Sequence, residues 1–142
     1  MAALRAETWG DEAYWKDRIG LYLSGEHSPH QALAPRAAFI AIEDRPITGF
    51  VAGHRTKRFG YDGELEWINV SKARRGQGIA DELLQTMAAW FVEKNALRVC
   101  VNVAPGNTVA RRFYARHGAV SLNKQWMAWE DIGVVNRARD QM

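Results

Sequence analysis

The chain has 142 residues, 47% apolar and 25% charged, a composition typical of a folded globular protein with one core. Its net charge of +3 is too mild to indicate nucleic-acid binding by itself, and neither a run of about twenty apolar residues nor a signal-peptide core is present. The single cysteine, Cys100, cannot form an internal disulfide, so we expect a cytoplasmic protein. From the length we expect one domain over residues 1–142.

Hydrophobic periodicity and turn residues predict short strands and helices in the first half of the chain. The predicted elements, in order, are an edge strand over residues 4–7, a helix over 11–23, a loop over 25–35, and a hairpin of strands 37–43 and 47–54.

In the second half the same signals are stronger, and Asn95, Asn107 and Gly118 supply helix start and stop signals. The predicted elements are a strand over 64–70, a helix from 80 to about 95, a strand over 97–103, a helix from 107 to 118, a closing hairpin of 120–122 with 125–130, and a loosely held tail after about 133.

A basic, glycine-containing turn joins the strand over 64–70 to the following helix. Gly76 and Gly78 let the main chain approach a bulky anion, and Arg74 and Arg75 carry forked donors for phosphate oxygens. The first turn of the helix adds unpaired N–H groups and a partial positive charge. A Walker loop would need a lysine followed by serine or threonine after its second glycine, and a dinucleotide fingerprint would need glycine or alanine where Asp81 stands. The turn therefore indicates a different phosphate-containing ligand.

Two motifs resemble the conserved blocks of the GNAT family of N-acetyltransferases. Arg75-x-x-Gly78-x-Ala80 is similar to the family's acetyl-CoA signature, and Asn107-x-x-Ala110 followed by Tyr114 and Gly118 is similar to its second block, one strand further on. Ala119 departs from the phenylalanine that usually follows that glycine. The resemblance implies an α+β fold of three α/β layers, with a mixed, mostly antiparallel central sheet of six to seven strands flanked by helices.

The resemblance also implies a role for each matching position. Pantetheine would lie where strand 65–70 splays away from strand 98–103, and Tyr114 would be the general acid beside the sulfur of acetyl-CoA. The implied acetyl-CoA-binding residues are the strand residues Ile68, Asn69 and Val70, the pyrophosphate turn Arg75, Gly76, Gln77, Gly78, Ile79 and Ala80, and Asn107 with Ala110 beside the pantetheine arm.

Acetyl transfer to an amine needs a stabilised oxyanion, an acid for the departing thiolate and a base for the amine. A strand N–H, that of Ile68 or Val70, suits the first, and the phenol of Tyr114 suits the second. Alternation along the strand predicts that Glu64, Glu66, Ile68 and Val70 share one face, with Trp67 on the other. Glu66, acting through a water, is our first candidate for the base, and Glu64 is the second.

The acceptor is constrained least by these motifs. Asp62, Glu64 and Glu66 would make its side of the site acidic, so we expect a cationic small-molecule amine, with a protein amine (N-terminal or lysine) as the alternative. We expect no metal, because the four histidines are scattered, and neither a nucleic-acid nor a membrane partner; a homodimer stays open. Two other classes remain: a non-catalytic acyl-CoA-binding module, which Tyr114 argues against, and a nucleic-acid-binding domain, which lacks stacking aromatics beside its basic cluster.

Overall fold

The computed structural model describes residues 1–9, 32–42 and 47–140, together with Tyr14, Lys16, Ile19, Tyr22 and Leu23. Its helices are α1 (Ala2–Trp9), α3 (Ile79–Glu93), α4 (Thr108–Arg116) and α5 (Val134–Asp140), with short 3-10 helices η1 (Arg58–Gly60) and η2 (Lys72–Arg74). Its strands are β1 (Ala32–Ile42), β2 (Ile47–Thr56), β3 (Gly63–Val70), β4 (Val99–Asn102), β5 (Val120–Ser121) and β6 (Trp126–Trp129).

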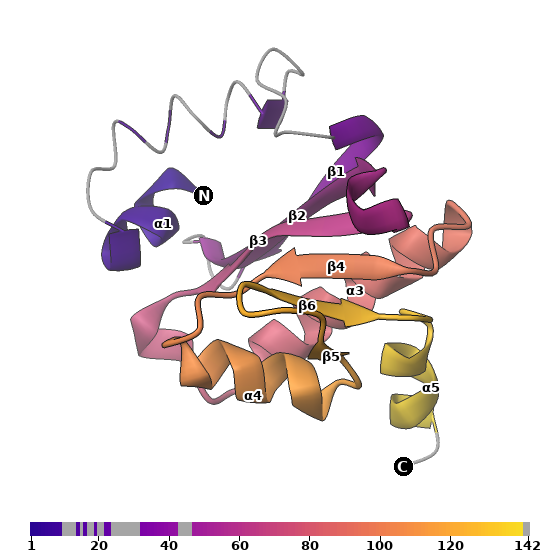
Figure 1. The fold of residues 1–142 in the computed structure, drawn as a ribbon. Helices are drawn as coiled ribbons and strands as arrows, with labels where there is room; N and C mark the ends of the chain where they lie inside the picture. The colour runs from indigo at the N-terminus through magenta and orange to yellow at the C-terminus, as the bar shows by residue number, and fades with distance from the viewer. Residues whose placement is uncertain are drawn as a thin grey trace.

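The strands form one six-stranded sheet in the order β1-β2-β3-β4-β6-β5 (Figure 1). The pair β3–β4 is parallel, and the other four pairs are antiparallel. The expected fold class is therefore confirmed: a mixed, mostly antiparallel sheet flanked by helices. None of the helices in the described part of the chain is both long and apolar enough to span a membrane.

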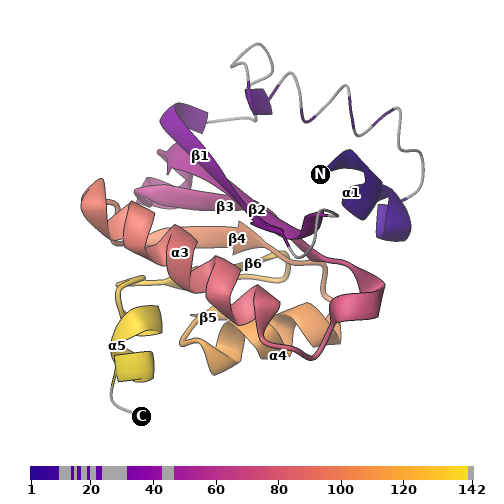
Figure 2. The same ribbon diagram turned by 180° about the vertical axis from the view of Figure 1, so that it is seen from behind.

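Helix α3 covers one face of the sheet, in front in Figure 2, and contacts β1, β2 and β3. Val51 and Leu65 point into the core beneath it, whereas Phe50, Ala52 and Trp67 form a second apolar cluster on the opposite face, against Ala2 and Ala6 of α1. A Cβ at Gly63 would lie 2.6 Å from the Phe91 ring, so only glycine lets α3 approach the sheet this closely.

A β-bulge changes which β3 side chains share a face. Gly53 lies opposite Leu65 and Ala52 lies opposite Trp67, so Glu66 is the extra residue. Ile68 and Val70 consequently pack toward α3, as Leu65 does, while Glu64 and Glu66 lie beside His54 on the opposite face, where Trp67 also lies. The predicted common face of Glu64, Glu66, Ile68 and Val70 is wrong, because strict alternation does not allow for the bulge.

Strands β3 and β4 pair over a short distance and then separate. Their ladder joins Gly63, Glu64 and Leu65 to Val99, Cys100 and Val101, whereas β3 continues to Val70. The later residues of β3 are paired with β2 on their other side. Among the residues that the structure describes, no strand pairs with the β4-facing edge of β3 from the bulge onward, and we call this the open edge of β3.

The two ends of the chain differ from the expectation. Residues 4–7 belong to α1 rather than to an edge strand, because Ala2 and Ala6, one turn apart, pack on the sheet and the segment is rich in strong helix formers. After Gly133 the chain forms α5 instead of a loose tail, with Val135 buried and Asn136 Nδ2 donating to the Gln85 carbonyl. Most of the predicted helix 11–23 and of the loop 25–35 lies outside the described residues; the described positions of the former are helical, and β1 already begins at Ala32.

Candidate functional site

The turn from β3 to α3 presents an anion-binding geometry. Gly76 and Gly78 have φ values of 81° and 84°, which favour glycine, and a Cβ at either would point into open space. Gly78 is the N-cap of α3 and makes no side-chain capping hydrogen bond, which leaves the first-turn N–H groups as donors for an anion. Arg75 is exposed and its Nε donates to the Val70 carbonyl across 3.3 Å, which fixes the arginine stem at the end of β3.

The predicted pantetheine residues line the open edge of β3 and the start of α4. Ile68 and Val70 are half-buried against the core, and Asn69 lies on the opposite face, where its Oδ1 accepts a 2.7 Å hydrogen bond from Arg5 Nη1. Asn107 caps α4 as expected, with its Oδ1 accepting from the Ala110 N–H. These contacts fix where the residues lie, and their binding of pantetheine stays a prediction.

Tyr114 is 5% exposed and packs between the rings of Phe113 and Trp129, at centroid distances of 5.3 and 5.8 Å. Burial raises the pKa of its phenol well above the ordinary value, and the positive charge of Arg5 opposes this shift in part. The hydroxyl therefore keeps its proton at neutral pH. The side chain is a core residue, and its role as proton donor stays a prediction.

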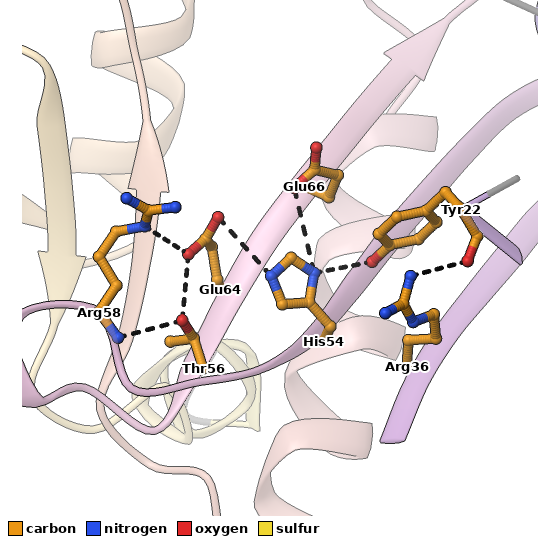
Figure 3. A network of polar contacts seen from close by, with 7 residues as sticks. All are labelled: Tyr22, Arg36, His54, Thr56, Arg58, Glu64 and Glu66. Atoms are coloured by element: carbon orange, nitrogen blue, oxygen red, sulfur yellow. Dashed lines mark hydrogen bonds and ion pairs between the residues drawn. The ribbon is translucent and has the colours of Figure 1, made fainter. Parts of the chain in front are cut away.

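A polar cluster lies on the face opposite α3, at the point where β3 and β4 separate (Figure 3). His54 of β2 lies between two carboxylates of β3, with its Nε2 3.7 Å from Glu64 Oε2 and its Nδ1 4.0 Å from Glu66 Oε2. The pairing of β2 with β3 sets His54 directly opposite Glu64, and the bulge brings Glu66 to the same side. Alternation alone gave no signal for this arrangement, since hairpin register was needed to bring residue 54 to residue 64.

The two carboxylates differ in what surrounds them. Glu64 Oε1 accepts a 2.8 Å hydrogen bond from Arg58 Nε and a 3.3 Å hydrogen bond from Thr56 Oγ1, and its side chain is 5% exposed. Glu66 has a side chain that is 12% exposed and lies on the Tyr22 side of His54. The charge of Glu64 is thus balanced by Arg58 inside the protein.

His54 and Tyr22 are both neutral at physiological pH. Burial, followed by the positive charges of Arg36 and Arg58, lowers the pKa of His54 to about 4. The Tyr22 hydroxyl shares a 2.9 Å hydrogen bond with His54 Nδ1, and burial, followed by the charge of Glu66, raises the pKa of this phenol. His54 Nε2 makes no hydrogen bond to any described residue.

His54, Glu64 and Glu66 offer three ligand atoms within 4.8 Å of one another, a spacing that could hold a cation. Arg58 already pairs with Glu64, however, so the charge of this carboxylate is compensated without a cation at the site. His117 lies elsewhere, with its Nε2 2.6 Å from Asp81 Oδ1, and His27 and His30 fall outside the described residues. The absence of a metal stays a prediction.

Arg58 offsets part of the negative charge that Asp62, Glu64 and Glu66 bring to this side of the site. Glu64 is paired with Arg58, and Asp62 Oδ2 accepts the backbone N–H of Arg98 across 3.0 Å. Glu66 lies in the same cluster, with its Oε2 4.0 Å from His54 Nδ1. The cationic amine acceptor stays a prediction.

Cys100 is fully buried beside Glu64, and burial raises the pKa of its thiol to about 12. A thiol that is protonated at neutral pH is a poor nucleophile. A covalent acetyl-cysteine route is therefore disfavoured by the structure.

Comparison with known proteins identifies the fold and the family. The crystal structure of a putative acetyltransferase of the GNAT family from Desulfovibrio desulfuricans is similar, with a TM-score of 0.67, 15% identity, and coverage of 85% of this chain and 80% of that chain. Nourseothricin acetyltransferase is similar with a TM-score of 0.58 and 20% identity over 66% of this chain and 64% of that one. A putative streptothricin acetyltransferase from Bacillus anthracis, in complex with acetyl coenzyme A, has a TM-score of 0.57 and 21% identity over 68% and 61%.

The chain thus spans less than two thirds of two of these proteins, and at these identities the likeness shows the fold. No curated protein matches the sequence. The profile of the Acetyltransferase (GNAT) family matches residues 3–119, a range that includes both motifs, the open edge of β3 and the His54 cluster. The chain belongs to the GNAT family of acetyltransferases.

Proposed function

We propose that the protein is an N-acetyltransferase that uses acetyl-CoA as co-substrate and transfers the acetyl group directly to a primary amine in a ternary complex. The observation that carries the proposal is the junction at which β3 and β4 separate. There the open edge of β3 leads to an uncapped glycine turn at one end, with the Glu66 cluster at the other, and Tyr114 is buried in α4. The family and the acetyl-CoA complex of the similar Bacillus anthracis protein support this co-substrate.

The residues present fit acetyl-CoA. The first-turn N–H groups of α3 and the Arg75 guanidinium are donors for a pyrophosphate, and the unpaired edge of β3 offers backbone groups to an amide-containing arm. When bound, acetyl-CoA supplies a thioester carbonyl for attack and a thiolate as leaving group. Ile68 to Val70 then hold the arm by backbone hydrogen bonds, with Asn107 and Ala110 beside it.

Two proton transfers are assigned to side chains of this chain. Glu66 takes a proton from the acceptor ammonium so that the nitrogen can form its bond to the acetyl carbon. Tyr114, whose phenol is protonated at neutral pH, donates to the sulfur as the carbon–sulfur bond breaks. Glu64 is less suited to be the base, since Arg58 holds its carboxylate in an ion pair.

The acceptor that we propose first is a small-molecule amine, because two of the similar acetyltransferases are named for such compounds, nourseothricin and streptothricin. The test is a panel of primary amines with acetyl-CoA, in which thiol release and the mass of the product are measured together. A converging pattern of double-reciprocal lines is expected for a ternary complex.

The matched variant for this test is Tyr114→Phe, which keeps the packing of the ring and removes the donor. We expect kcat to fall by about 10² or more while acetyl-CoA binding persists. Undiminished kcat in Tyr114→Phe would remove the phenol as the acid, and no acetylated product with any amine would contradict the proposed function.

A further inference from the structure

Two aromatic side chains lie beside the polar cluster around His54. Phe59 of η1 and Trp126 of β6 meet edge to face, with ring centroids 5.4 Å apart and an interplanar angle of 81°. Phe59 is 49% exposed, and Trp126 is half-buried against a small cluster that contains Cys100 and Ala128. We call Phe59 and Trp126 the aromatic pair.

The register of the sheet sets Trp126 across the β3–β4 separation from Glu66. The parallel ladder ends where Leu65 lies opposite Val101. The next residues of the two strands, Glu66 and Asn102, therefore lie on either side of the separation, and Asn102 is paired with Trp126. Val101 lies in the core beneath α3, so alternation points Asn102 to the opposite face, where Glu66 also lies. The candidate base and the aromatic pair thus share one face of the sheet.

Arg58 connects the polar cluster with the aromatic pair. Its Nε donates to Glu64 Oε1 across 2.8 Å, on the side of Glu64 away from His54 (Figure 3). Its guanidinium carbon lies 4.7 Å from the centroid of the Trp126 ring. Since this guanidinium already lies over the indole, the aromatic pair offers a ligand apolar ring surface rather than a site for a second cation.

The backbone of Phe59 is held in a conformation that a bulky residue disfavours. Phe59 has φ 57° and ψ 18°, and Gly60 follows with φ 74°. The Tyr61 N–H donates to the Arg58 carbonyl across 2.9 Å, which closes a turn whose two central residues are left-handed. Asparagine followed by glycine is the favoured sequence for such a turn. The strain at Phe59 keeps an apolar ring on the surface beside the polar cluster, and strained residues concentrate at functional sites.

We propose that the aromatic pair binds the apolar body of the acceptor, so that the preferred substrate is a primary monoamine with an apolar group rather than a polyamine or a hydroxyalkylamine. The amine nitrogen lies on the Glu66 side of the β3–β4 separation, and the apolar body extends past Asn102 to Phe59 and Trp126. This inference rests on the proposed function, and it makes Phe59 and Trp126 specificity-determining residues.

The first experiment compares kcat/KM for phenethylamine and ethanolamine in the parent and in two Phe59 variants. The parent should prefer phenethylamine by about tenfold or more, because even one methylene in an apolar pocket changes this ratio by about 10- to 200-fold. Phe59→Asn should lose most of the preference, and Phe59→Tyr, which keeps the ring, should retain it. A second pair of amines, n-butylamine and diaminobutane, differs in the second ammonium, and the parent should prefer n-butylamine.

Thermal unfolding separates a binding role of Phe59 from a structural one. Asparagine suits the left-handed backbone at this position, so Phe59→Asn should melt no lower than the parent although its preference for phenethylamine falls. Val92→Asn is the matched control, because Val92 is 41% exposed on α3, which covers the other face of the sheet. This control should keep the preference of the parent.

Binding can also be followed without turnover, through the indole N–H resonance of Trp126 in the NMR spectrum. The resonance is assigned by its loss in Trp126→Phe. With coenzyme A present, phenethylamine should shift this resonance in the parent and shift it less in Phe59→Asn at the same concentration. Ethanolamine should shift it less than phenethylamine does.

Equal kcat/KM values for phenethylamine and ethanolamine in the parent would overturn the inference, as would a preference for diaminobutane over n-butylamine. A preference for phenethylamine that Phe59→Asn leaves unchanged would overturn it as well. Absence of acetylated product with every amine would instead contradict the proposed function. The two failures are told apart because the Trp126 resonance reports the binding of phenethylamine without turnover.

Discussion

Glu64 and Glu66 lie two positions apart on β3 and differ in what contacts their carboxylates. Glu64 accepts hydrogen bonds from Arg58 and Thr56, whereas Glu66 lies near His54 Nδ1. We expect Glu66→Gln to lower kcat/KM at neutral pH by about 10² or more. Glu64→Gln should instead lower the free energy of unfolding by about 3 kcal/mol, because it leaves the Arg58 charge uncompensated at a mostly buried site. The measurements are pH–rate profiles and urea unfolding of both variants; a pH–rate profile that Glu66→Gln leaves unchanged would remove Glu66 as the base.

His54 also couples folding to pH. Its folded-state pKa of about 4 lies below the ordinary value of about 6.5, so the folded protein binds fewer protons than the unfolded chain between these values. The free energy of unfolding should therefore fall as the pH falls from about 6.5 to about 4, by at most about 3 kcal/mol from this residue.

His54→Asn is the matched variant for this effect, since an amide cannot titrate in that range. Urea unfolding at a series of pH values should give a flatter dependence for the variant between pH 6.5 and 4. Parallel curves for parent and variant would contradict the neutral, buried state of His54.

At the scale of elements, local pattern was enough for the elements from β3 to β6. Strand β3, helix α3 and the Asn107 cap of α4 follow from periodicity and capping residues, and Asn95 ends α3 with a positive φ as expected. The bulge at Glu66 could not be predicted in this way, because it depends on how β2 and β3 align and not on either strand alone. The bulge puts Glu66 on the opposite face of β3 from Ile68, where strict alternation predicts the same face. It thereby places the candidate base beside His54.

The backbone conformation of the turn before α3 predicts the effect of a substitution at Gly78. Gly78 has φ +84° and space for a Cβ, so Gly78→Ala is strained by its backbone and not by a clash. We expect a loss of about 1–2 kcal/mol in the free energy of unfolding, or a rearranged turn, and in either case weaker acetyl-CoA binding. Gly106→Ala is the control, because a Cβ there also meets nothing and its φ lies outside the left-handed region. Calorimetric titration with acetyl-CoA should separate the two variants, and equal affinities would argue that the turn conformation is not used for binding.

For the whole molecule, the family resemblance of two short blocks anticipated the sheet and its flanking helices, which the structure confirms. The resemblance did not anticipate the helices at the two chain ends or the side-chain contacts between strands. Helix α1 packs on the sheet and brings Arg5 to Asn69, and α5 packs against α3 and brings Val135 into the core. These contacts join segments far apart in the sequence, so local pattern does not reveal them. The network of Tyr22, His54, Glu64 and Arg58 likewise joins four separate segments of sequence.

The account depends most on acetyl-CoA binding along the open edge of β3 with its pyrophosphate at the α3 turn. The direct measurement is thermal unfolding of the parent and of Arg75→Glu, each with and without acetyl-CoA. A ligand at a hundred times its dissociation constant stabilises the folded state by about 2.7 kcal/mol, so the parent should melt several degrees higher with acetyl-CoA and Arg75→Glu should show little or no shift. An equal shift in both proteins would place the pyrophosphate elsewhere, and no shift in either would contradict the acetyl-CoA site.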